Sequence, residues 1–424
     1  MLDLTEALKA TEALAQTNDG LSSVLFYQSE HCKDLVNEVF RYDTLGTPNV
    51  QPMNTGSWES YFSRMSHPVD LVMIELTDCV NVIAKINELA AVLPNTTSVV
   101  VIGTEDAIST IRSLKEMGFY YLFWPVTKAE MSDFLRHVCK NHRAGSGLGK
   151  ERSAKRIAVI GAKGGVGCTL IACELATFLR RESFSRVMLV DHGYADSNLD
   201  VMMRLDAFNK LNVSKSALRL SQLDEVSAQS LLHKAHEEIA VLALDGLQTS
   251  IQECYHQTST LVEMLLRGYN LVVEDLSASR EFPLDYAALH QHYDTVVLVI
   301  DPTVSAVRSA KRVLHRLDIS AAPNTPPPRV LVVLNQHRTF RDGVLYRNEI
   351  EQQLKRPVDL EVAYEKSIPS VLLSGVGFSD IGGRFASSMQ ALSMQVLGRK
   401  WQPKIHPALG WLQRLNKKWQ EIRA

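Results

Sequence analysis

The chain has 424 residues, of which 46% are hydrophobic and 22% are charged. This length exceeds that of one typical domain, so two or three domains with full apolar cores are expected. The 45 basic and 47 acidic residues give a net charge of −2. Such a balance gives no indication of a dedicated nucleic-acid binder, and no nucleic-acid partner is expected, although a local basic patch is left open.

The N-terminal segment and the cysteines both indicate a protein that stays inside the cell. The segment "MLDLTEALKATEALAQTNDG" contains acidic residues and no long apolar core, unlike a signal peptide. No stretch approaches the about 20 uninterrupted apolar residues of a membrane span. The six cysteines, at positions 32, 79, 139, 168, 173 and 254, have neither zinc-site spacing nor a regular disulfide framework. We therefore expect a soluble, cytoplasmic protein with reduced thiols.

Residues 1–140 are predicted to form an α/β domain. Apolar runs such as "SSVLFYQ", "VDLVMIEL" and "SVVVIGT" alternate with helical stretches such as "NVIAKINELAAVL" and "AISTIRSLKEMG". Strands and helices that alternate at this spacing indicate βαβ units and a parallel sheet. The segment that follows, "NHRAGSGLGKERSAK", is rich in glycine, serine and charge, and it predicts a linker over residues 141–155.

The order of these elements resembles the response-regulator receiver domain, which implies a flavodoxin-like fold. In that family the third strand ends in a phosphorylated aspartate, and a lysine precedes a proline after the fifth strand. The matching positions here are Glu75 and, before Pro125, Trp124, and "LFYQSEH" offers only Glu30 in place of an acidic pair. Because the aspartate, the acidic pair and the lysine that phosphoryl transfer needs are missing, the resemblance implies a degenerate receiver domain that acts by contacting other proteins or domains. Alternatively, Glu75 is an ordinary carboxylate at a strand end of an unrelated flavodoxin-like domain.

The segment "GAKGGVGCT", residues 161–169, follows the apolar run "RIAVI" and predicts a phosphate-binding loop. Its crowded glycines let backbone N–H groups surround phosphates. Thr169 lies in the first turn of the helix "TLIACELATFLRRES", where it is placed to ligate Mg²⁺. Cys168 takes the place of the lysine that normally reaches the β- and γ-phosphates. It is expected to be a small filler, and the alternative is a redox-sensitive thiol with a lowered pKa.

Residues 156–400 are predicted to form a second, larger α/β domain with a mostly parallel sheet. Its further strands are expected at "RVMLVDH", "IAVLALDG", "NLVVEDL", "TVVLVID" and "RVLVVLNQ". In "NLVVEDL", Asp275 follows mostly apolar residues, as does a Walker B carboxylate that holds a metal through water. Any buried strand–helix turn favours glycines and a capping threonine, but Lys163, the glycines, Thr169 and Asp275 together favour ATP and Mg²⁺ as ligands.

The pattern KGGVGxT, with its early Lys163, resembles the deviant Walker A motif of the MinD/ParA ATPases. The segment "VMLVDHGYADSNLD" matches switch I, "YNLVVEDLSAS" matches the Walker B region, and "VVLNQ" matches the strand that presents an asparagine to the adenine. The resemblance implies Thr169, Asp191 and Asp275 on the metal side, and a homodimer in which Lys163 reaches the partner's nucleotide. It implies a nucleotide site formed by Lys163, Gly164, Gly165, Val166, Gly167, Cys168, Thr169 and Asn335.

Two departures from this family concern hydrolysis. Switch I of the family supplies an aspartate that orients the attacking water, and this sequence has Gly193 at that position, so the catalytic residues stay unassigned. The loop lysine is also replaced, by Cys168. Losing such groups costs on the order of 10²-fold or more each, so weak or absent hydrolysis is expected. Asp196 lies three residues further along and would substitute only if the loop shifted.

A degenerate receiver ahead of such a domain narrows the resemblance to the TadZ/CpaE family, the pilus-assembly proteins of the tight-adherence (Flp pilus) system. This implies a dimerising localisation scaffold that recruits pilus and secretion components, such as the secretion ATPase, at the inner membrane or the cell pole. Two other classes remain as alternatives: an active ATPase whose hydrolysis cycle drives positioning or assembly, and a two-component regulator.

The C-terminal segment 401–424 predicts an amphipathic helix. From Ala408 onward, one helical stripe carries Trp411, Leu412, Leu415, Trp419 and Ile422. Residues 407–424 are therefore expected to attach to the membrane surface, to another protein, or to the body of their own domain. The histidines at 233, 236, 290 and 292 lack partners at ligand spacing and are expected on helix surfaces rather than at a metal.

Overall fold

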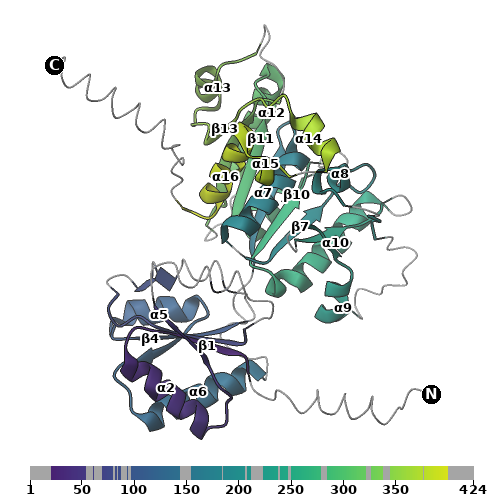
Figure 1. The fold of residues 1–424 in the computed structure, drawn as a ribbon. Coiled ribbons are helices and arrows are strands. Elements are labelled where there is room, and N and C mark those ends of the chain that lie inside the picture. The colour runs from purple at the N-terminus through teal and green to yellow at the C-terminus, as the bar shows by residue number, and fades with distance from the viewer. Residues whose placement is uncertain are drawn as a thin grey trace, which may run out of the picture.

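Two α/β units make up the structure, which is a computed structural model (Figure 1). The residues that it describes are 21–53, 61, 69–79, 82–83, 85–86, 93, 97–143, 154–183, 185–205, 208–211, 223–236, 239–246, 250–277, 284–320, 326–337, 344–375 and 377–399. The predicted C-terminal amphipathic helix, residues 401–424, lies outside this part of the chain. Within the described residues, no helix is both long enough and apolar enough to cross a membrane.

The N-terminal unit has one sheet with the strand order β2-β1-β3-β4-β5. All its strand pairs are parallel. This order is that of doubly wound, flavodoxin-like folds, so the predicted fold class is confirmed for this unit. Its elements are β1 (Ser23–Tyr27), α2 (Glu30–Tyr42), β2 (Asn49–Pro52), β3 (Leu71–Glu75), β4 (Ser98–Gly103), α5 (Ile108–Glu116), β5 (Tyr120–Phe123) and α6 (Lys128–Arg143).

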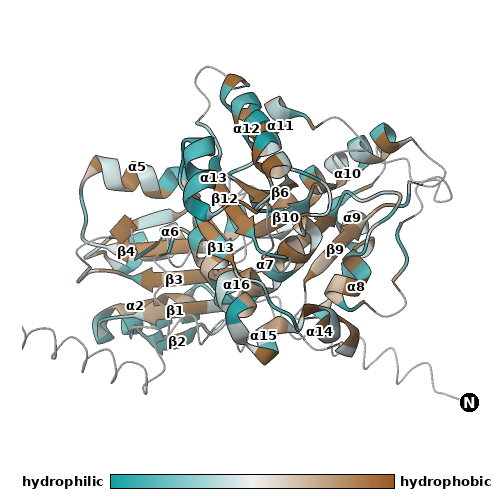
Figure 2. Ribbon diagram, turned by 90° about the horizontal axis from the view of Figure 1, so that it is seen from above, coloured by the Kyte–Doolittle hydropathy of each residue, from teal (hydrophilic) through white to brown (hydrophobic). Residues whose placement is uncertain are grey.

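The central strands of this unit are apolar along their whole length because both faces of the sheet are covered. Every residue of β3 and β4 is buried, as expected for a parallel sheet between two helical layers. The edge strand β2 was not predicted, because its sequence "NVQP" has no apolar run and is partly exposed. In Figure 2 the strands of both sheets are mostly brown, whereas the helices alternate between brown and teal.

The C-terminal unit has one sheet with the order β13-β12-β11-β6-β10-β7-β9-β8. Its described pairs are parallel except for β8 with β9. The mostly parallel sheet that was predicted is therefore confirmed. Its strands are β6 (Lys155–Gly161), β7 (Val187–Asp191), β8 (His233–Lys234), β9 (Ala240–Ala243), β10 (Leu271–Asp275), β11 (Thr295–Ile300), β12 (Arg329–Asn335) and β13 (Leu360–Val362).

Two apolar layers, one on each face, cover this second sheet. The helix that follows the loop segment, α7 (Cys168–Ser183), packs on one face together with α14 (Ile368–Ser374), α15 (Phe378–Ile381) and α16 (Gly383–Val396). The other face is covered by α10 (Ile251–Leu265), α11 (Tyr286–His292), α12 (Val304–Ile319) and α13 (Arg347–Leu354). The short helices α8 (Leu199–Met203) and α9 (Glu225–Ser230), with a 3₁₀ turn at Leu266–Gly268, complete the unit.

The boundary between the units differs slightly from the predicted linker 141–155. Helix α6 continues to Arg143, and β6 begins at Lys155. The two units also touch, because the side-chain amide of Asn270 donates a hydrogen bond to the carbonyl of Leu93. Asn270 directly precedes β10, so this contact lies where β10 and its parallel neighbour β6 begin. The phosphate-binding loop lies at the other end of these strands, next to the carboxyl end of β6.

Glu75 is a buried structural carboxylate of the N-terminal unit. Its side chain is 0% exposed. One oxygen accepts hydrogen bonds from the backbone N–H groups of Gln28 and Ser29, at 2.6 and 2.9 Å. The other accepts one from the Ser29 hydroxyl, at 2.6 Å. Glu75 therefore joins the end of β3 to the N-terminal cap of α2, and both of its oxygens are engaged.

We expect the N-terminal unit to be inert to small phosphodonors, because the carboxylate at the phosphoacceptor position is enclosed and fully hydrogen-bonded. Incubation with acetyl phosphate and Mg²⁺, followed by intact-mass measurement, should show no added phosphate. A receiver domain with an intact aspartate, treated in parallel, serves as the positive control. A stoichiometric, acid-labile adduct on residues 21–140 would show that this expectation is wrong.

Candidate nucleotide-binding site

The loop between β6 and α7 has a backbone that needs glycine at two positions. Gly165 and Gly167 have φ values of +78° and +90°, in the left-handed region that other residues rarely adopt. Around Gly165 the space is open, but a Cβ on Gly167 would lie 2.5 Å from the side-chain nitrogen of Asn335. The loop thus brings its backbone into close contact with the end of β12.

Asn335 supports the loop in this structure. It is buried at the end of β12, and its side-chain amide donates a hydrogen bond to the Val166 carbonyl at 2.8 Å. The resemblance assigned Asn335 to the adenine, and that role stays a prediction. The geometry adds a second role, since the same amide group fixes the middle of the phosphate-binding loop.

Cys168 is buried beneath the loop at the first position of α7. Its sulfur lies 2.9 Å from the point that a Cβ on Gly161 would occupy. Burial raises the pKa of the Cys168 thiol well above its usual range, and the nearby Asp275 charge raises it further. A thiol that stays protonated is a poor nucleophile, so the structure favours the filler interpretation over the redox-sensor interpretation.

The metal side of the site lies at the carboxyl ends of two neighbouring strands. Asp275 on β10 and Asp191 on β7 are register partners, and both are 1% exposed. Thr169 and Ser277 approach each other at 3.2 Å between hydroxyl oxygens, and the Ser277 N–H donates to Asp275 at 3.0 Å. The pKa of Asp275 is raised to about 6, first by burial and then by the charge of Asp191.

These oxygens fit Mg²⁺. One oxygen of Asp191 is buried and accepts no hydrogen bond from the described residues. The Lys210 ammonium lies 3.1 Å from this oxygen, so a metal bound there would share it with Lys210. Mg²⁺ prefers oxygen ligands and is usually held by one or two carboxylates together with substrate phosphates. Among the described residues, no group of three or more His, Cys, Asp or Glu side chains could hold a metal ion. Thr169, Asp275 and Asp191 would hold the ion, which would supply positive charge beside the phosphates.

A hollow of about 390 Å³ lies between the loop and the switch I segment. It unites most of the sequence-predicted residues, since the whole run from Lys163 to Thr169 lines it together with Asp191. Asn335 and Asp275 do not line the hollow. Asn335 is bonded to the loop through the Val166 carbonyl, and Asp275 is bonded to Ser277. The other lining residues are Leu170, Gly193, Asp196, Ser197, Asn198, Met202 and Ser277.

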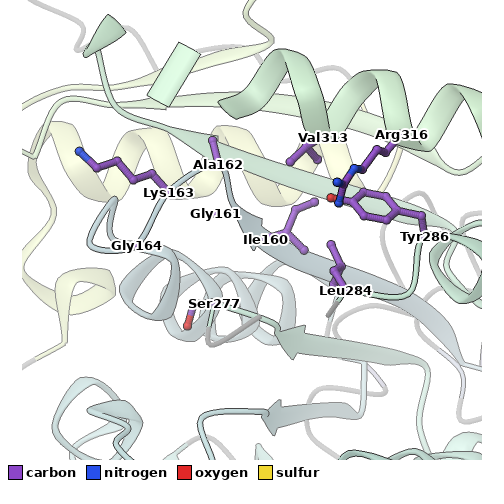
Figure 3. Close-up of a pocket in the computed structure, with 10 residues that line it drawn as sticks. All are labelled: Ile160, Gly161, Ala162, Lys163, Gly164, Ser277, Leu284, Tyr286, Val313 and Arg316. Carbon is purple, nitrogen blue, oxygen red and sulfur yellow. The ribbon is translucent and has the colours of Figure 1, made fainter. Parts of the chain in front are cut away.

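A second, smaller pocket of about 250 Å³ adjoins the loop on the α12 side (Figure 3). The Arg316 guanidinium lies over the Tyr286 ring in this pocket, 5.6 Å from the ring centre. Lys163 also belongs to the lining, but Figure 3 shows its side chain directed away from Tyr286 and Arg316. Its ammonium group donates to the Ser305 hydroxyl at 3.1 Å. Within a single chain, therefore, Lys163 rests on the start of α12.

Gly193, at the expected position of the catalytic aspartate, has little room for a side chain. Its N–H donates to Asp191 at 2.8 Å. A Cβ on Gly193 would lie 3.0 Å from an Asp191 oxygen and 3.0 Å from the Cβ of Ser197. An aspartate here would be crowded and would place a second negative charge beside Asp191. Besides Asp191, the acidic residue that lines the hollow is Asp196.

Sequence reasoning missed three features of this region. Ser277 follows Asp275 by two residues, and its place in the quoted Walker B segment was the only signal. Lys210 lies 3.1 Å from Asp191, and nothing in its sequence context indicated this. The third feature is a buried polar network behind the metal side, in which Glu274 joins His192 at 2.9 Å and Arg156 at 2.8 Å.

The histidine expectation was wrong for His290 and His233. His290 is 4% exposed, because it lies on the inner side of α11, and His233 lies in the edge strand β8 rather than on a helix. His236 and His292 are exposed. A histidine on an amphipathic segment faces inward or outward according to the tertiary packing, which the HxH spacing does not reveal.

A glycine loop at a helix N-terminus, a hydroxyl in the first helical turn and two strand-end carboxylates define a P-loop nucleotide-binding domain. Residues 157–376, more than half of the chain, match the model of the CobQ/CobB/MinD/ParA nucleotide binding domain. The chain belongs to this family. The MinD/ParA resemblance is therefore confirmed at the level of the domain.

The chain is also similar to curated relatives and to solved structures. The septum site-determining protein MinD of Bacillus subtilis (strain 168) is 27% identical over 204 residues, which are 47% of this chain and 72% of the relative. MinD of Helicobacter pylori is 25% identical over 165 residues, 38% of this chain and 58% of the relative. A ParA family ATPase from Chlorobium tepidum is similar with a TM-score of 0.48 and 19% identity, over 57% of this chain and 99% of that chain. MinD from Pyrococcus horikoshii in complex with Mg-ADP has a TM-score of 0.43 and 15% identity, over 57% and 96%.

Proposed function

We propose that this protein is a nucleotide-binding, dimerising scaffold that positions components of tight-adherence (Flp) pilus assembly and secretion, with weak or absent ATP hydrolysis. The receiver-like domain acts through contacts rather than phosphorylation. ATP with Mg²⁺ is the expected ligand. The expected location is the cytoplasm, with peripheral attachment at the inner membrane or the cell pole through residues 407–424.

One observation carries the proposal: the hollow combines a glycine loop, a hydroxyl and carboxylates that suit a nucleotide with a cysteine and a glycine at the two positions that serve hydrolysis in the family. The loop still presents backbone N–H groups, and Thr169 lies beside two buried carboxylates. At the two positions that serve hydrolysis in the family, Cys168 is a buried thiol and Gly193 is enclosed. Binding without efficient turnover is the behaviour of a scaffold whose state depends on occupancy rather than on a hydrolysis cycle.

The arrangement of the two units supports dimerisation through the loop edge. The described contact between the units, from Asn270 to Leu93, lies where β10 begins. The loop and Lys163 lie at the other edge of the sheet, which this contact leaves open. In the proposed dimer, Lys163 exchanges the Ser305 hydroxyl for the phosphates of the partner's nucleotide.

Binding, turnover and association are measured together on the full chain. Equilibrium titration with a fluorescent ATP analogue and Mg²⁺ should show binding, while phosphate release stays near background. Lys163→Ala should weaken both the affinity and any ATP-dependent dimerisation seen by sedimentation, because it removes a charge-assisted contact to phosphate. Lys115→Ala, an exposed lysine on α5 of the other unit, is the control and should change neither.

The pilus assignment needs its own test. In cells that assemble such pili, a fluorescently tagged chain should localise to the membrane or the pole and co-purify with the secretion ATPase. Removal of residues 407–424 should abolish the localisation while the protein still folds. Normal pilus assembly after deletion of the whole gene would contradict the assignment.

The active-ATPase alternative is favoured by one observation, which is that Asp196 lines the hollow. With the loop shifted, this carboxylate would take the place of the missing catalytic aspartate. If the wild-type chain hydrolyses ATP at an appreciable rate and Asp196→Asn abolishes that activity, the ATPase replaces the scaffold. If turnover stays at background in both, the scaffold stands.

A further inference from the structure

A lysine from outside every sequence motif reaches the metal-side carboxylate. The Lys210 ammonium lies 3.1 Å from one oxygen of Asp191 and donates a hydrogen bond to the Gly193 carbonyl. We propose that Lys210 is a positioning residue, a tethered cation that holds Asp191 and the switch I backbone in place without a metal. On this proposal it makes nucleotide binding only weakly dependent on Mg²⁺. This inference rests on the nucleotide site proposed above.

The residue that follows Lys210 is hydrogen-bonded to the sheet, so the chain is anchored directly beside Lys210. Leu211, the next residue, forms a parallel β-bridge with Leu244, just beyond β9. The Leu211 N–H donates to Ala243 at 2.9 Å, and the Leu211 carbonyl accepts from Asp245 at 2.8 Å. The Lys210 side chain is 20% exposed. It is therefore largely enclosed along its path to the carboxylate.

Asp191 needs a charge partner, because it is 1% exposed. One of its oxygens accepts from the Gly193 N–H at 2.8 Å, and the other accepts no hydrogen bond from the described residues. That second oxygen is the one that Lys210 approaches. Among the described residues, Lys210 is the only cation that forms an ion pair with Asp191. The structure thus balances a buried charge with the chain's own ammonium group.

Lys210 does not compete for the space of the nucleotide. The hollow is lined by Asp191 and Gly193, but Lys210 is not part of its lining. The next residue, Leu211, is bridged to Leu244 just beyond β9, so Lys210 reaches Asp191 and Gly193 from the side of β9. A bound phosphate would therefore leave Lys210 in place, and both Lys210 and a metal would act on the same carboxylate.

The expected consequence follows from Coulomb's law. An ammonium beside Asp191 neutralises the carboxylate and repels an incoming divalent cation. The attraction between the metal and this carboxylate is therefore weaker than it would be at an unpaired carboxylate. Without Lys210, Asp191 and its register partner Asp275 would be two buried like charges with no ammonium group beside them, and a metal would relieve their repulsion. Removal of Lys210 should therefore make nucleotide binding strongly dependent on Mg²⁺, whereas it is only weakly dependent in the wild-type chain.

The test uses the full chain and two readouts that do not involve turnover. Thermal unfolding is followed in MgCl₂ and in NaCl of equal ionic strength, without nucleotide. Lys210→Met should unfold at a lower temperature than wild type in NaCl and should gain more stability from Mg²⁺. In titrations with a fluorescent ATP analogue, the ratio of Kd in EDTA to Kd in Mg²⁺ should rise by at least about tenfold in Lys210→Met. Lys115→Met should match wild type in both assays.

A neutral pair separates the charge effect from a folding defect. Lys210→Met with Asp191→Asn leaves no buried charge, so it should regain thermal stability over the single variant and lose the added response to Mg²⁺. Equal Mg²⁺ responses of wild type and Lys210→Met would overturn the inference, as would failure of both variants to fold. If no variant binds the nucleotide, the proposed function fails, and the unfolding experiment with Mg²⁺ alone still decides the role of Lys210.

Discussion

Gly167→Val should abolish nucleotide binding while the protein stays folded. Gly167 has a φ of +90°, and a Cβ there would lie 2.5 Å from the Asn335 side-chain nitrogen. Valine would strain the backbone and displace the amide that holds the Val166 carbonyl. The N–H groups of the loop would then no longer converge on phosphates, and we expect the affinity for an ATP analogue to fall at least about 100-fold, the equivalent of two tenfold steps.

A matched control distinguishes this clash from backbone strain alone. Gly375 ends α14 with a φ of +70°, and a Cβ there would meet no atom within 4 Å. Gly375→Val should therefore cost similar backbone strain without affecting the loop, and its affinity for the analogue should match that of wild type. Unchanged affinity in Gly167→Val would show that the loop does not hold the phosphates.

The sequence was a good guide wherever function follows from local backbone chemistry. The glycines of the loop were predicted from their crowding, and the structure requires two of them, Gly165 and Gly167, by their φ values. The resemblance implied Asp191 and Asp275 on the metal side, and the two are register partners at the carboxyl ends of neighbouring parallel strands.

The sequence was a poor guide wherever function depends on a contact between distant segments. Lys210 lies in a segment that is joined to the sheet by a single β-bridge. A single bridge leaves no periodic pattern in the sequence, so it could not be predicted. Glu75 was placed correctly at a strand end, but its bonds to Gln28 and Ser29 arise only when β1 lies beside β3. Asn335 was expected at the adenine, and its contact with Val166 depends on how closely β12 approaches the loop.

The two departures from the family's motifs, Cys168 and Gly193, are each accommodated by packing. The Cys168 sulfur fills the space next to Gly161, and Gly193 is enclosed by Asp191 and Ser197. A longer side chain at either position would have to displace what now surrounds it. The site is thus adapted to the smaller residues, which agrees with a scaffold better than with an ATPase that has lost a single group.

Behind the metal side, a buried polar network joins strands β6 and β10 to the switch I segment. Glu274 is 1% exposed and accepts hydrogen bonds from Tyr293 at 2.8 Å and from Arg156 at 2.9 Å. It also pairs with His192 at 2.9 Å, and His192 contacts the Tyr194 hydroxyl at 2.7 Å. Burial alone would raise the pKa of Glu274, but His192 and Arg156 hold it at about 2. The carboxylate therefore stays charged within the core.

Glu274→Leu should lower the free energy of unfolding of the C-terminal unit by about 3–5 kcal/mol, because it leaves the Arg156 charge and the partners of Glu274 buried without their acceptor. Replacing Arg156 by methionine in the same chain should recover much of this loss, since an apolar pair then fills the space of the ion pair. Urea unfolding followed separately for the two units measures both effects, and the transition of the N-terminal unit should not move.

The same guanidinium supplies the control for this prediction. Arg156 also pairs with Glu263 at 2.6 Å, but the Glu263 side chain is 51% exposed. Glu263→Leu removes a carboxylate from the same arginine at a position where water screens the charge, so it should cost less than about 1 kcal/mol. A similar, small cost for Glu274→Leu and Glu263→Leu would mean that the network adds no more stability than a surface ion pair. A large cost for Glu274→Leu alone would identify it as the buried support of the Walker B strand, one residue before Asp275.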